Sequence, residues 1–150
     1  KEFSPFYNYS RRNFVVIIAR TKEGKYITVR QFRHGLKKIT TEFCAGGIEG
    51  NEHESALLAA KRELQEETGY VSDHWKHIYT IPSNPTIADN YAYLYYADDC
   101  EKVSNQHLDS TEFLEVKEYT EDEIDDLIKN NEFVQPIHLM GWLMVKKGLL

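Results

Sequence analysis

The sequence is poor in cysteine and contains no long apolar run. Its two cysteines, Cys44 and Cys100, show no CxxC spacing and are too few for a disulfide framework, so we expect reduced thiols and a cytoplasmic location. The longest apolar run, FVVIIA at residues 14–19, is far too short to cross a bilayer, and we expect no membrane association. No secretory signal pattern is visible, although a chain that begins at Lys1 rather than Met leaves room for native residues ahead of it.

Basic residues are also scarce relative to acidic ones. Lys and Arg number 18 against 24 Asp and Glu, which gives a net charge of −6. This balance argues against a nucleic-acid partner, because phosphate backbones require Lys and Arg patches. An anionic small-molecule substrate would need another source of positive charge, such as a divalent cation. The six histidines are scattered without the spacing of a zinc site.

The remaining composition is that of an ordinary globular protein. The chain has 150 residues, of which 41% are hydrophobic and 28% charged, and it contains no internal repeat, linker or low-complexity tract. We expect one domain over residues 1–150, with a short N-terminal arm at 1–13.

Hydrophobic periodicity predicts a mixture of strands and helices. A hairpin is expected from strands at 14–20 and 26–32, joined by the turn TKEGK. Ser55 and Gly69 delimit a helix as its N-cap and its C-terminal stop. Further strands are expected at 74–81, 91–97 and 112–119, and further helices at 120–131 and from Pro136 to the end. This order of elements predicts an α/β (α+β) sandwich.

The predicted helix at 55–68 collects three carboxylates beside its apolar face. Glu63, Glu66 and Glu67 are spaced i, i+3 and i+4 and share one side of the helix. That side borders the apolar stripe, which consists of Ala56, Leu57, Ala60 and Leu64. Like charges crowded at the edge of a core are destabilising unless they share a cation, and Mg²⁺ prefers such oxygen ligands. The alternative is a solvated helix in which Arg62 pairs with Glu66.

The residues around this helix resemble a known family. The pattern E-x7-R-E-L-x-E-E-x-G-Y from Glu54 to Tyr70 is similar to the signature of the Nudix hydrolases, which cleave nucleoside diphosphates linked to a further group. One position departs from the signature: it expects a glycine six residues before Glu54, where this chain has Ile48. Gly47 lies one residue too far away, so we expect a longer loop there.

Flanking segments resemble the ADP-ribose pyrophosphatase branch of the family. VRQFRHG followed by TEFCAGGIE is similar to the segment before the signature in that branch, except that Cys44 stands where proline is usual. Pro85, sixteen residues after Gly69, matches a proline typical of the branch, and EFLEV resembles its C-terminal part. The resemblance implies a Nudix-type α/β/α sandwich with a mixed β-sheet.

The resemblance also implies roles for acidic residues. Glu63 and Glu67 correspond to metal ligands, Glu66 to a third ligand or a catalytic partner of the ligands, and the Ala45 carbonyl to a further oxygen ligand. Glu112 corresponds to the residue that positions or deprotonates the attacking water, with Asp109 as the alternative. Glu112 could equally be a plain solvated acid.

Substrate contacts are implied at three further positions. Arg33 corresponds to a ligand of the substrate phosphates, since Arg offers a fixed fork of donors, although it could be an ordinary exposed strand-end residue. Glu42 could accept from an adenine amino group or simply sit on a strand edge, and Pro85 belongs to the substrate side of the site. Arg62, grouped with the catalytic residues, would brace the acids of its own helix and loop.

The implied reaction is Mg²⁺- or Mn²⁺-dependent hydrolysis of ADP-ribose to AMP and ribose 5-phosphate, with a nucleoside diphosphate derivative as the small-molecule substrate. Two alternatives stay open: another nucleoside diphosphate sugar such as GDP-mannose, and a non-catalytic domain that senses nucleotides. Dinucleoside polyphosphates are disfavoured, because Ile87 replaces an expected tyrosine. The branch commonly forms homodimers through N-terminal strands, and we expect a homodimer here.

Overall fold

A computed structural model describes residues 5–50, 55–108 and 113–149. Over these ranges the chain forms eight strands of one mixed sheet and three helices. In chain order the elements are β1 Phe14–Thr21, β2 Tyr26–Arg33, β3 Lys38–Glu42, β4 Cys44–Gly47, α1 Ala56–Thr68, β5 Tyr70–Val71, β6 His74–Pro82, β7 Tyr91–Lys102, β8 Glu115–Tyr119, α2 Glu121–Lys129 and α3 Pro136–Lys146. The predicted α+β sandwich with a mixed sheet is confirmed.

The sheet is built around β1 and β7, which run parallel to each other. Its order is β3-β2-β1-β7-β5, while β4 pairs with β1, β6 with β7 and β8 with β2. The predicted hairpin is present as the antiparallel pair β1 and β2, in which Ala19 lies opposite Ile27. The parallel pairing brings the first residues of β1 and β7 to the same edge of the sheet.

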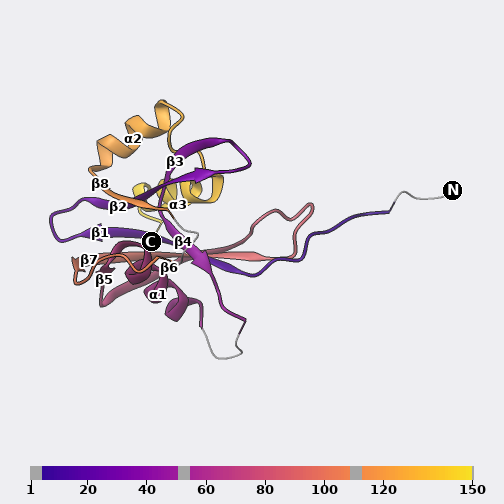
Figure 1. Ribbon diagram of the computed structural model, residues 1–150, viewed down its shortest axis with the longest axis horizontal. Helices are drawn as coiled ribbons and strands as arrows, with labels where there is room; N and C mark the ends of the chain where they lie inside the picture. The colour runs from indigo at the N-terminus through magenta and orange to yellow at the C-terminus, as the bar shows by residue number, and fades with distance from the viewer. Residues whose placement is uncertain (1–4, 51–54, 109–112, 150) are drawn as a thin grey trace.

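Helices cover both faces of the sheet, so β1 is buried on both sides (Figure 1). Side chains alternate along a strand: Val15 and Ile17 pack in the core under α1, whereas Val16 and Ile18 pack in the core under α2 and α3. This double burial explains why the strand is a continuous apolar run in the sequence rather than an alternating one.

Helix α3 lies very close to the sheet. A Cβ atom at Gly141 would come within 2.8 Å of Leu94 Cδ2 and 3.1 Å of Ile18 Cδ1. Trp142 is fully buried, meets Tyr26 edge to face at 4.7 Å between ring centroids, and donates its indole N–H to Asp125 at 3.0 Å. The middle of α3 is thereby fixed against the sheet.

Three predicted elements are shorter in the structure, and one of them is α2, which covers Glu121–Lys129 of the helix predicted at 120–131. Strand β8 begins at Glu115, because the preceding carbonyl, that of Leu114, accepts from the side chain of Gln106 rather than continuing the ladder with β2. Helix α3 ends at Lys146, where Gly148 takes the left-handed conformation (φ 66°) that stops a helix.

Candidate functional site

Strand β4 offers its outer edge to the acidic helix. Strand β4 pairs with β1 in antiparallel fashion, and the N–H of Ile48 bonds to the carbonyl of Asn13. Because hydrogen-bonded and non-hydrogen-bonded pairs alternate along an antiparallel ladder, Gly47 and Ala45 fall in non-hydrogen-bonded pairs. The N–H and C=O groups of Ala45 and Gly47 therefore turn away from β1. The Ala45 N–H donates to Glu67 Oε2 at 3.2 Å, and the Gly47 carbonyl accepts from Arg62 Nη2 at 3.1 Å. Helix α1 is thus fastened to β4 by two side chains of the Nudix-like signature.

The limits of α1 are those that the sequence predicts. The Ser55 hydroxyl accepts the N–H of Leu58 at 3.3 Å, and Gly69 ends the helix with φ 77°. A Cβ at Gly69 would lie 2.1 Å from the carbonyl oxygen of Ser104, so glycine is also required for the chain to pass so close. This geometry fixes the two ends of α1.

Glu63 lies directly against Gly46. A Cβ atom at position 46 would stand 1.9 Å from Cδ of Glu63 and 2.2 Å from each of its carboxylate oxygens. The Glu63 side chain is 14% exposed. The absence of a side chain at position 46 is therefore what lets this carboxylate lie beside β4.

Arg62 links the acidic residues to one another. Its Nη1 donates to Glu63 Oε1 and to Glu66 Oε2, both at 2.9 Å. Glu66 is the more open of the two, with 45% of its side chain exposed. Arg62 thus contacts two acids of its own helix, and its pair with Glu66 is the one that the alternative of a solvated helix also expects.

Glu67 is buried at the helix–strand junction, with 6% exposure. Besides the Ala45 N–H, its carboxylate hydrogen-bonds the thiol of Cys44. Burial of Cys44, followed by the nearby negative charge of Glu67, raises the pKa of the thiol well above its ordinary value. Cys44 is therefore a protonated donor that helps to hold the carboxylate.

Arg33 and Glu42 form a two-pronged ion pair beside this junction. Arg33 Nε donates to Glu42 Oε1 at 2.8 Å and Nη2 donates to Oε2, while the Thr40 hydroxyl also donates to Oε1 at 2.7 Å. Glu42 is 1% exposed, and although burial raises its pKa, the bonds from Arg33 and Thr40 hold it below the ordinary value. The Arg33 side chain is 41% exposed. The hydrogen bond to Glu42 is the main cause that raises the pKa of Arg33, and the negative charge of Glu67 raises it further.

Sequence reasoning gave no special role to His138, which the structure places next to this pair. The Phe43 N–H donates to His138 Nδ1 at 3.1 Å. Burial lowers the pKa of His138 to about 4, against a weaker opposing effect of Glu42. The neutral ring joins the first turn of α3 to the junction between β3 and β4. No local signal marks this histidine, because the contact spans 95 positions of the sequence.

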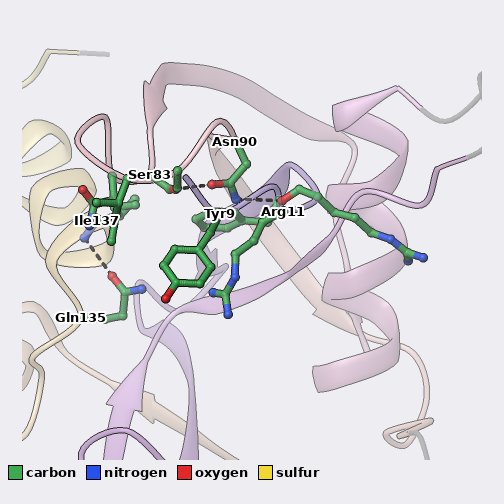
Figure 2. Close-up of a pocket in the computed structure, with 11 residues that line it drawn as sticks. Tyr9, Arg11, Ser83, Asn90, Gln135 and Ile137 are labelled. Atoms are coloured by element: carbon green, nitrogen blue, oxygen red, sulfur yellow. Dashed lines mark hydrogen bonds between the residues drawn. The ribbon is translucent and has the colours of Figure 1, made fainter. Parts of the chain in front are cut away.

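Pro85 lies exposed in the β6–β7 loop, and its neighbours belong to a pocket that the sequence did not predict. The pocket has a volume of about 680 Å³ and lies between this loop, the N-terminal arm and the start of α3 (Figure 2). Its lining residues are Tyr9, Arg11, Arg12, Phe14, Ser83, Asn84, Ile87, Ala88, Asn90, Gln135 and Ile137. Phe14 connects the pocket to the acidic site, since it lies opposite Gly47 in the sheet.

Three residues named by the sequence, Glu54, Asp109 and Glu112, lie outside the described residues. The chain on either side of 109–112 is nevertheless tied to α1. The amide nitrogen of Gln106 donates to the carbonyls of Glu67 at 2.7 Å and Leu114 at 3.2 Å, and the His107 N–H donates to the Glu66 carbonyl at 2.8 Å. The C-terminal turn of α1 therefore holds both ends of this loop.

The residues present fit a hard divalent cation. The cradle at Gly46 leaves room for the Glu63 carboxylate, Glu67 is nearby, and the Ala45 carbonyl turns to the same edge as its N–H. Across the described ranges, no three His, Cys, Asp or Glu side chains converge into a closed metal cluster. Mg²⁺ does not need one, because it commonly binds through one or two carboxylates together with substrate phosphates and water.

Comparisons with known proteins agree with this geometry. The NUDIX domain model matches residues 10–138. An ADP-ribose pyrophosphatase of Bacillus subtilis is 33% identical over 139 residues, which cover 90% of this chain and 74% of that protein. A methanol dehydrogenase activator of Bacillus methanolicus is 37% identical over 77% of this chain, and the match spans 62% of the activator.

Structural comparison gives the same fold. A crystal structure of an ADP compounds hydrolase matches with a TM-score of 0.80 and 22% identity, over 93% of this chain and 73% of the other. The fold is an α/β/α sandwich, and the family model together with the Bacillus subtilis relative defines its class as a hydrolase. The chain belongs to the Nudix family and is a pyrophosphohydrolase of that family. Within the described ranges, no helix is long and apolar enough to span a membrane.

Proposed function

We propose that the chain hydrolyses the pyrophosphate bond of ADP-ribose and releases AMP and ribose 5-phosphate. One P–O bond of the P–O–P bridge breaks, the oxygen of water joins the phosphorus, and the departing phosphate keeps the bridging oxygen. The observation that carries the proposal is the placement of the Glu63 carboxylate in the space left by Gly46, beside the buried Glu67. The identity to an ADP-ribose pyrophosphatase supports the choice of substrate.

The cofactor in this proposal is Mg²⁺ or Mn²⁺, held by Glu63, Glu67 and the Ala45 carbonyl, with Glu66 as a further ligand or partner. Bound there, the cation would supply positive charge to the phosphates and activate water for attack. The chain's own part is to hold the carboxylates in place. Arg62 does so from the helix side, and the Ala45 N–H and the Cys44 thiol do so from β4.

Arg33 is the proposed phosphate contact. A guanidinium carries five N–H donors, and Glu42 engages the Nε and Nη2 positions. The Nη1 donors can therefore turn to a substrate oxygen while Glu42 keeps the group in a fixed plane. A pre-oriented Arg fork recognises phosphate with less loss of side-chain entropy than a mobile one. Glu112 completes the proposal as the residue that orients the water.

The test is hydrolysis of ADP-ribose, GDP-mannose and a diadenosine polyphosphate with and without Mg²⁺ or Mn²⁺, measured as the phosphate that an added phosphatase frees from the monoester products. We expect ADP-ribose to be cleaved fastest, and only with the metal. Glu67→Gln retains an oxygen to accept the Ala45 N–H but loses the charge, so it should reduce kcat by a factor of about 100 or more. Glu23→Gln, an exposed change in the β1–β2 turn, is the matched control and should leave kcat unchanged.

Two outcomes would redirect the proposal. Faster cleavage of GDP-mannose would make the chain a hydrolase of another nucleoside diphosphate sugar. If no substrate is cleaved but ADP-ribose still raises the melting temperature, the chain is a nucleotide sensor.

The same proposal includes a homodimer formed through the N-terminal arm. The arm extends away from the body of the molecule (Figure 1) and exposes 95% of Phe6 and 80% of Tyr7. Large aromatic side chains presented in this way are characteristic of association surfaces.

A further inference from the structure

A single backbone hydrogen bond joins helix α3 to the point where strands β3 and β4 meet. Phe43 is the one residue between these two strands. Before it, Glu42 is paired with Val29 of β2, and after it, Cys44 is paired with Ile17 of β1. The chain therefore passes from one neighbouring strand to the other at Phe43, and the N–H of this residue lies between the two ladders.

The acceptor of this N–H is the side chain of His138, which is only 1% exposed. The bond from the Phe43 N–H to His138 Nδ1 is 3.1 Å long. A ring nitrogen that accepts carries no proton, so the neutral ring holds its proton at Nε2. A buried N–H without an acceptor is costly. The side chain from α3 thus satisfies a backbone group that lies outside both ladders.

The ring of Phe43 is held by the same part of the chain. Three buried rings neighbour it, at centroid distances of 5.1, 5.9 and 6.5 Å: those of Phe133, Trp142 and His138. Close by, the Thr41 N–H donates to the Glu132 carbonyl at 2.9 Å. The C-terminal part of the chain therefore contacts the backbone and the side chain of the β3–β4 junction.

The two directions away from Phe43 lead into different parts of the candidate site. Because a peptide group is planar, the plane that contains the Phe43 N–H also contains the Cα of Glu42. Glu42 in turn holds two donor positions of Arg33. Two residues beyond Phe43, the N–H of Ala45 donates to Glu67 at 3.2 Å. The orientation of one peptide plane therefore affects both the Arg33 fork and the attachment of the buried carboxylate.

Helix α3 is a rigid support for this contact. It packs so closely that a Cβ at Gly141 would come within 2.8 Å of Leu94 Cδ2. One residue later, the Trp142 indole donates to Asp125 at 3.0 Å. A helical turn moves as a unit, so His138, three residues before Gly141, is held in place by the same contacts. The acceptor for Phe43 is thus fixed relative to the sheet.

We propose that His138 is a positioning residue for the hydrolysis. Its Nδ1 fixes the β3–β4 junction, and the junction orients the Arg33–Glu42 pair on one side and the Ala45–Glu67 contact on the other. His138 touches neither the substrate nor the metal, and what position 138 must supply is a hydrogen-bond acceptor rather than a charge. The inference rests on the proposed function, because the groups that it positions are those assigned to phosphate and metal.

The experiment compares His138→Leu, which has no acceptor, with His138→Asn, whose amide oxygen can accept the Phe43 N–H. In His138→Leu we expect kcat/KM for ADP-ribose to fall by a factor of about 10–100, as is usual when a group that supports a metal site is removed. In His138→Asn it should stay within about threefold of the unmodified chain, because the acceptor is restored.

Mn²⁺ binding gives a second readout that does not depend on turnover. The free ion is measured by electron paramagnetic resonance during titration of the protein without substrate. We expect the dissociation constant for Mn²⁺ to rise about tenfold in His138→Leu and to be almost unchanged in His138→Asn. A residue needed only for folding would not be rescued in this selective way.

Ile124→Val and Ile124→Ala are the controls for stability. Ile124 is fully buried in the same core as His138's neighbours Phe43 and Trp142, and its side chain forms no hydrogen bond. The two truncations destabilise the fold to different extents, so one of them can be compared with His138→Leu at a similar melting temperature. Below the melting transition, both should keep the kcat/KM and the Mn²⁺ affinity of the unmodified chain.

Three results would overturn the inference: full activity in His138→Leu, an equal loss in His138→Asn, or an equal loss in an Ile124 variant of similar melting temperature. If His138→Leu does not fold, His138→Met replaces it with the same expected losses, since its flexible thioether fills the space and is only a weak acceptor.

The proposed function can fail separately from this inference. Cleavage of ADP-ribose at equal rates by the unmodified chain and His138→Leu would leave the hydrolysis standing and remove only the positioning role. If the unmodified chain cleaves nothing, the proposed hydrolysis is wrong, and the Mn²⁺ affinities of the two His138 variants still decide the positioning role. Absence of both cleavage and Mn²⁺ binding in the unmodified chain would overturn both.

Discussion

The carboxyl group of Glu63 lies in the space that a side chain at position 46 would need, with Cδ only 1.9 Å from the position of a Cβ there. Residues 46 and 63 are 17 positions apart in the sequence, yet the position of the Glu63 carboxylate depends on the absence of a side chain at residue 46. Glycine is required at position 46 because the Glu63 carboxylate lies beside it, and a substitution there can test this requirement.

Gly46→Ala should inactivate the protein while leaving it folded. The clash is with the end of a flexible side chain, so Glu63 can rotate away at modest cost in stability, but it then leaves its place beside β4. We expect kcat for ADP-ribose hydrolysis to fall by a factor of about 100 or more. Gly47→Ala is the matched control, because a Cβ at that position meets nothing within 4 Å. Equal activity of the two variants would contradict the role assigned to the glycine.

Glu42→Gln should weaken both stability and substrate binding. The change leaves Arg33 without its buried counter-ion, which we expect to cost about 2–4 kcal/mol in the free energy of unfolding. KM for ADP-ribose should rise about tenfold, since the guanidinium loses its fixed orientation. The comparison is Glu115→Gln, which breaks an exposed pair with Arg30 and should leave the free energy of unfolding almost unchanged. Urea unfolding and steady-state kinetics measure the two effects, and a Glu42 variant as stable as the Glu115 variant would refute the argument.

The neutral state of His138 predicts a loss of stability in acid. Burial depresses its pKa from 6.5 to about 4 in the folded state, so the unfolded chain binds this proton more readily. The contribution is complete above pH 6.5 and decreases as the pH falls toward 4, by at most about 3 kcal/mol. Urea unfolding at pH 7.5, 5.5 and 4.5 measures the slope.

His138→Gln is the variant that isolates this effect, because it lacks the titrating ring. Its unfolding free energy should change less between pH 7.5 and 4.5 than that of the unmodified chain. His74→Gln, at a site where 67% of the side chain is exposed, should retain the full pH dependence. Parallel curves for the unmodified chain and His138→Gln would show that the buried histidine is not the source.

Gln106→Met should reduce turnover with little change in KM. The amide of Gln106 joins the carbonyls of Glu67 and Leu114, so its loss releases the loop ends from the last turn of α1. We expect kcat to fall by about tenfold, because the groups that act on water are no longer positioned against the carboxylates. Asn105→Ala, an exposed change one residue earlier, serves as control. A rise in KM with unchanged kcat would instead place Gln106 in substrate binding.

Replacing Phe6 and Tyr7 together by Ser should dissociate the proposed homodimer. Both side chains are almost fully exposed on the arm, and their apolar area is lost in the variant. Light scattering should give the mass of two chains for the unmodified protein and of one for the variant. A single-chain mass for both would remove the dimer from the proposal.

The sequence predicts the local features of this protein well. Ser55 and Gly69 mark the ends of α1, and the spacing of Glu63 and Glu67 places both acids on one side of it, because capping and helical periodicity depend on neighbouring residues. The buried apolar run of β1 likewise identifies a strand covered on both faces.

Contacts between distant segments could not be predicted in this way. The bond from Phe43 to His138 spans 95 positions, and the pocket beside Arg11 exists only because the arm meets the β6–β7 loop. Residue type alone also could not identify the partners of Glu42. Its sequence context suggests a strand edge or a ligand for adenine, and in the fold it ends the edge strand β3 with both of its oxygens engaged by Arg33 and Thr40.

Helix α1 is attached to β4 partly by Glu67, which accepts the backbone N–H of Ala45. Glu67 therefore stabilises the packing of α1 on β4 in addition to its proposed part in the chemistry. A related protein that had lost all activity would still be more stable if it kept this glutamate. At Gly46 the nearest obstacle to a side chain is the Glu63 carboxylate, so the small size of this residue matters while Glu63 occupies the neighbouring space. Among proteins of this fold, the residue at the position of Gly46 should therefore separate working enzymes from silent ones better than the acid at the position of Glu67.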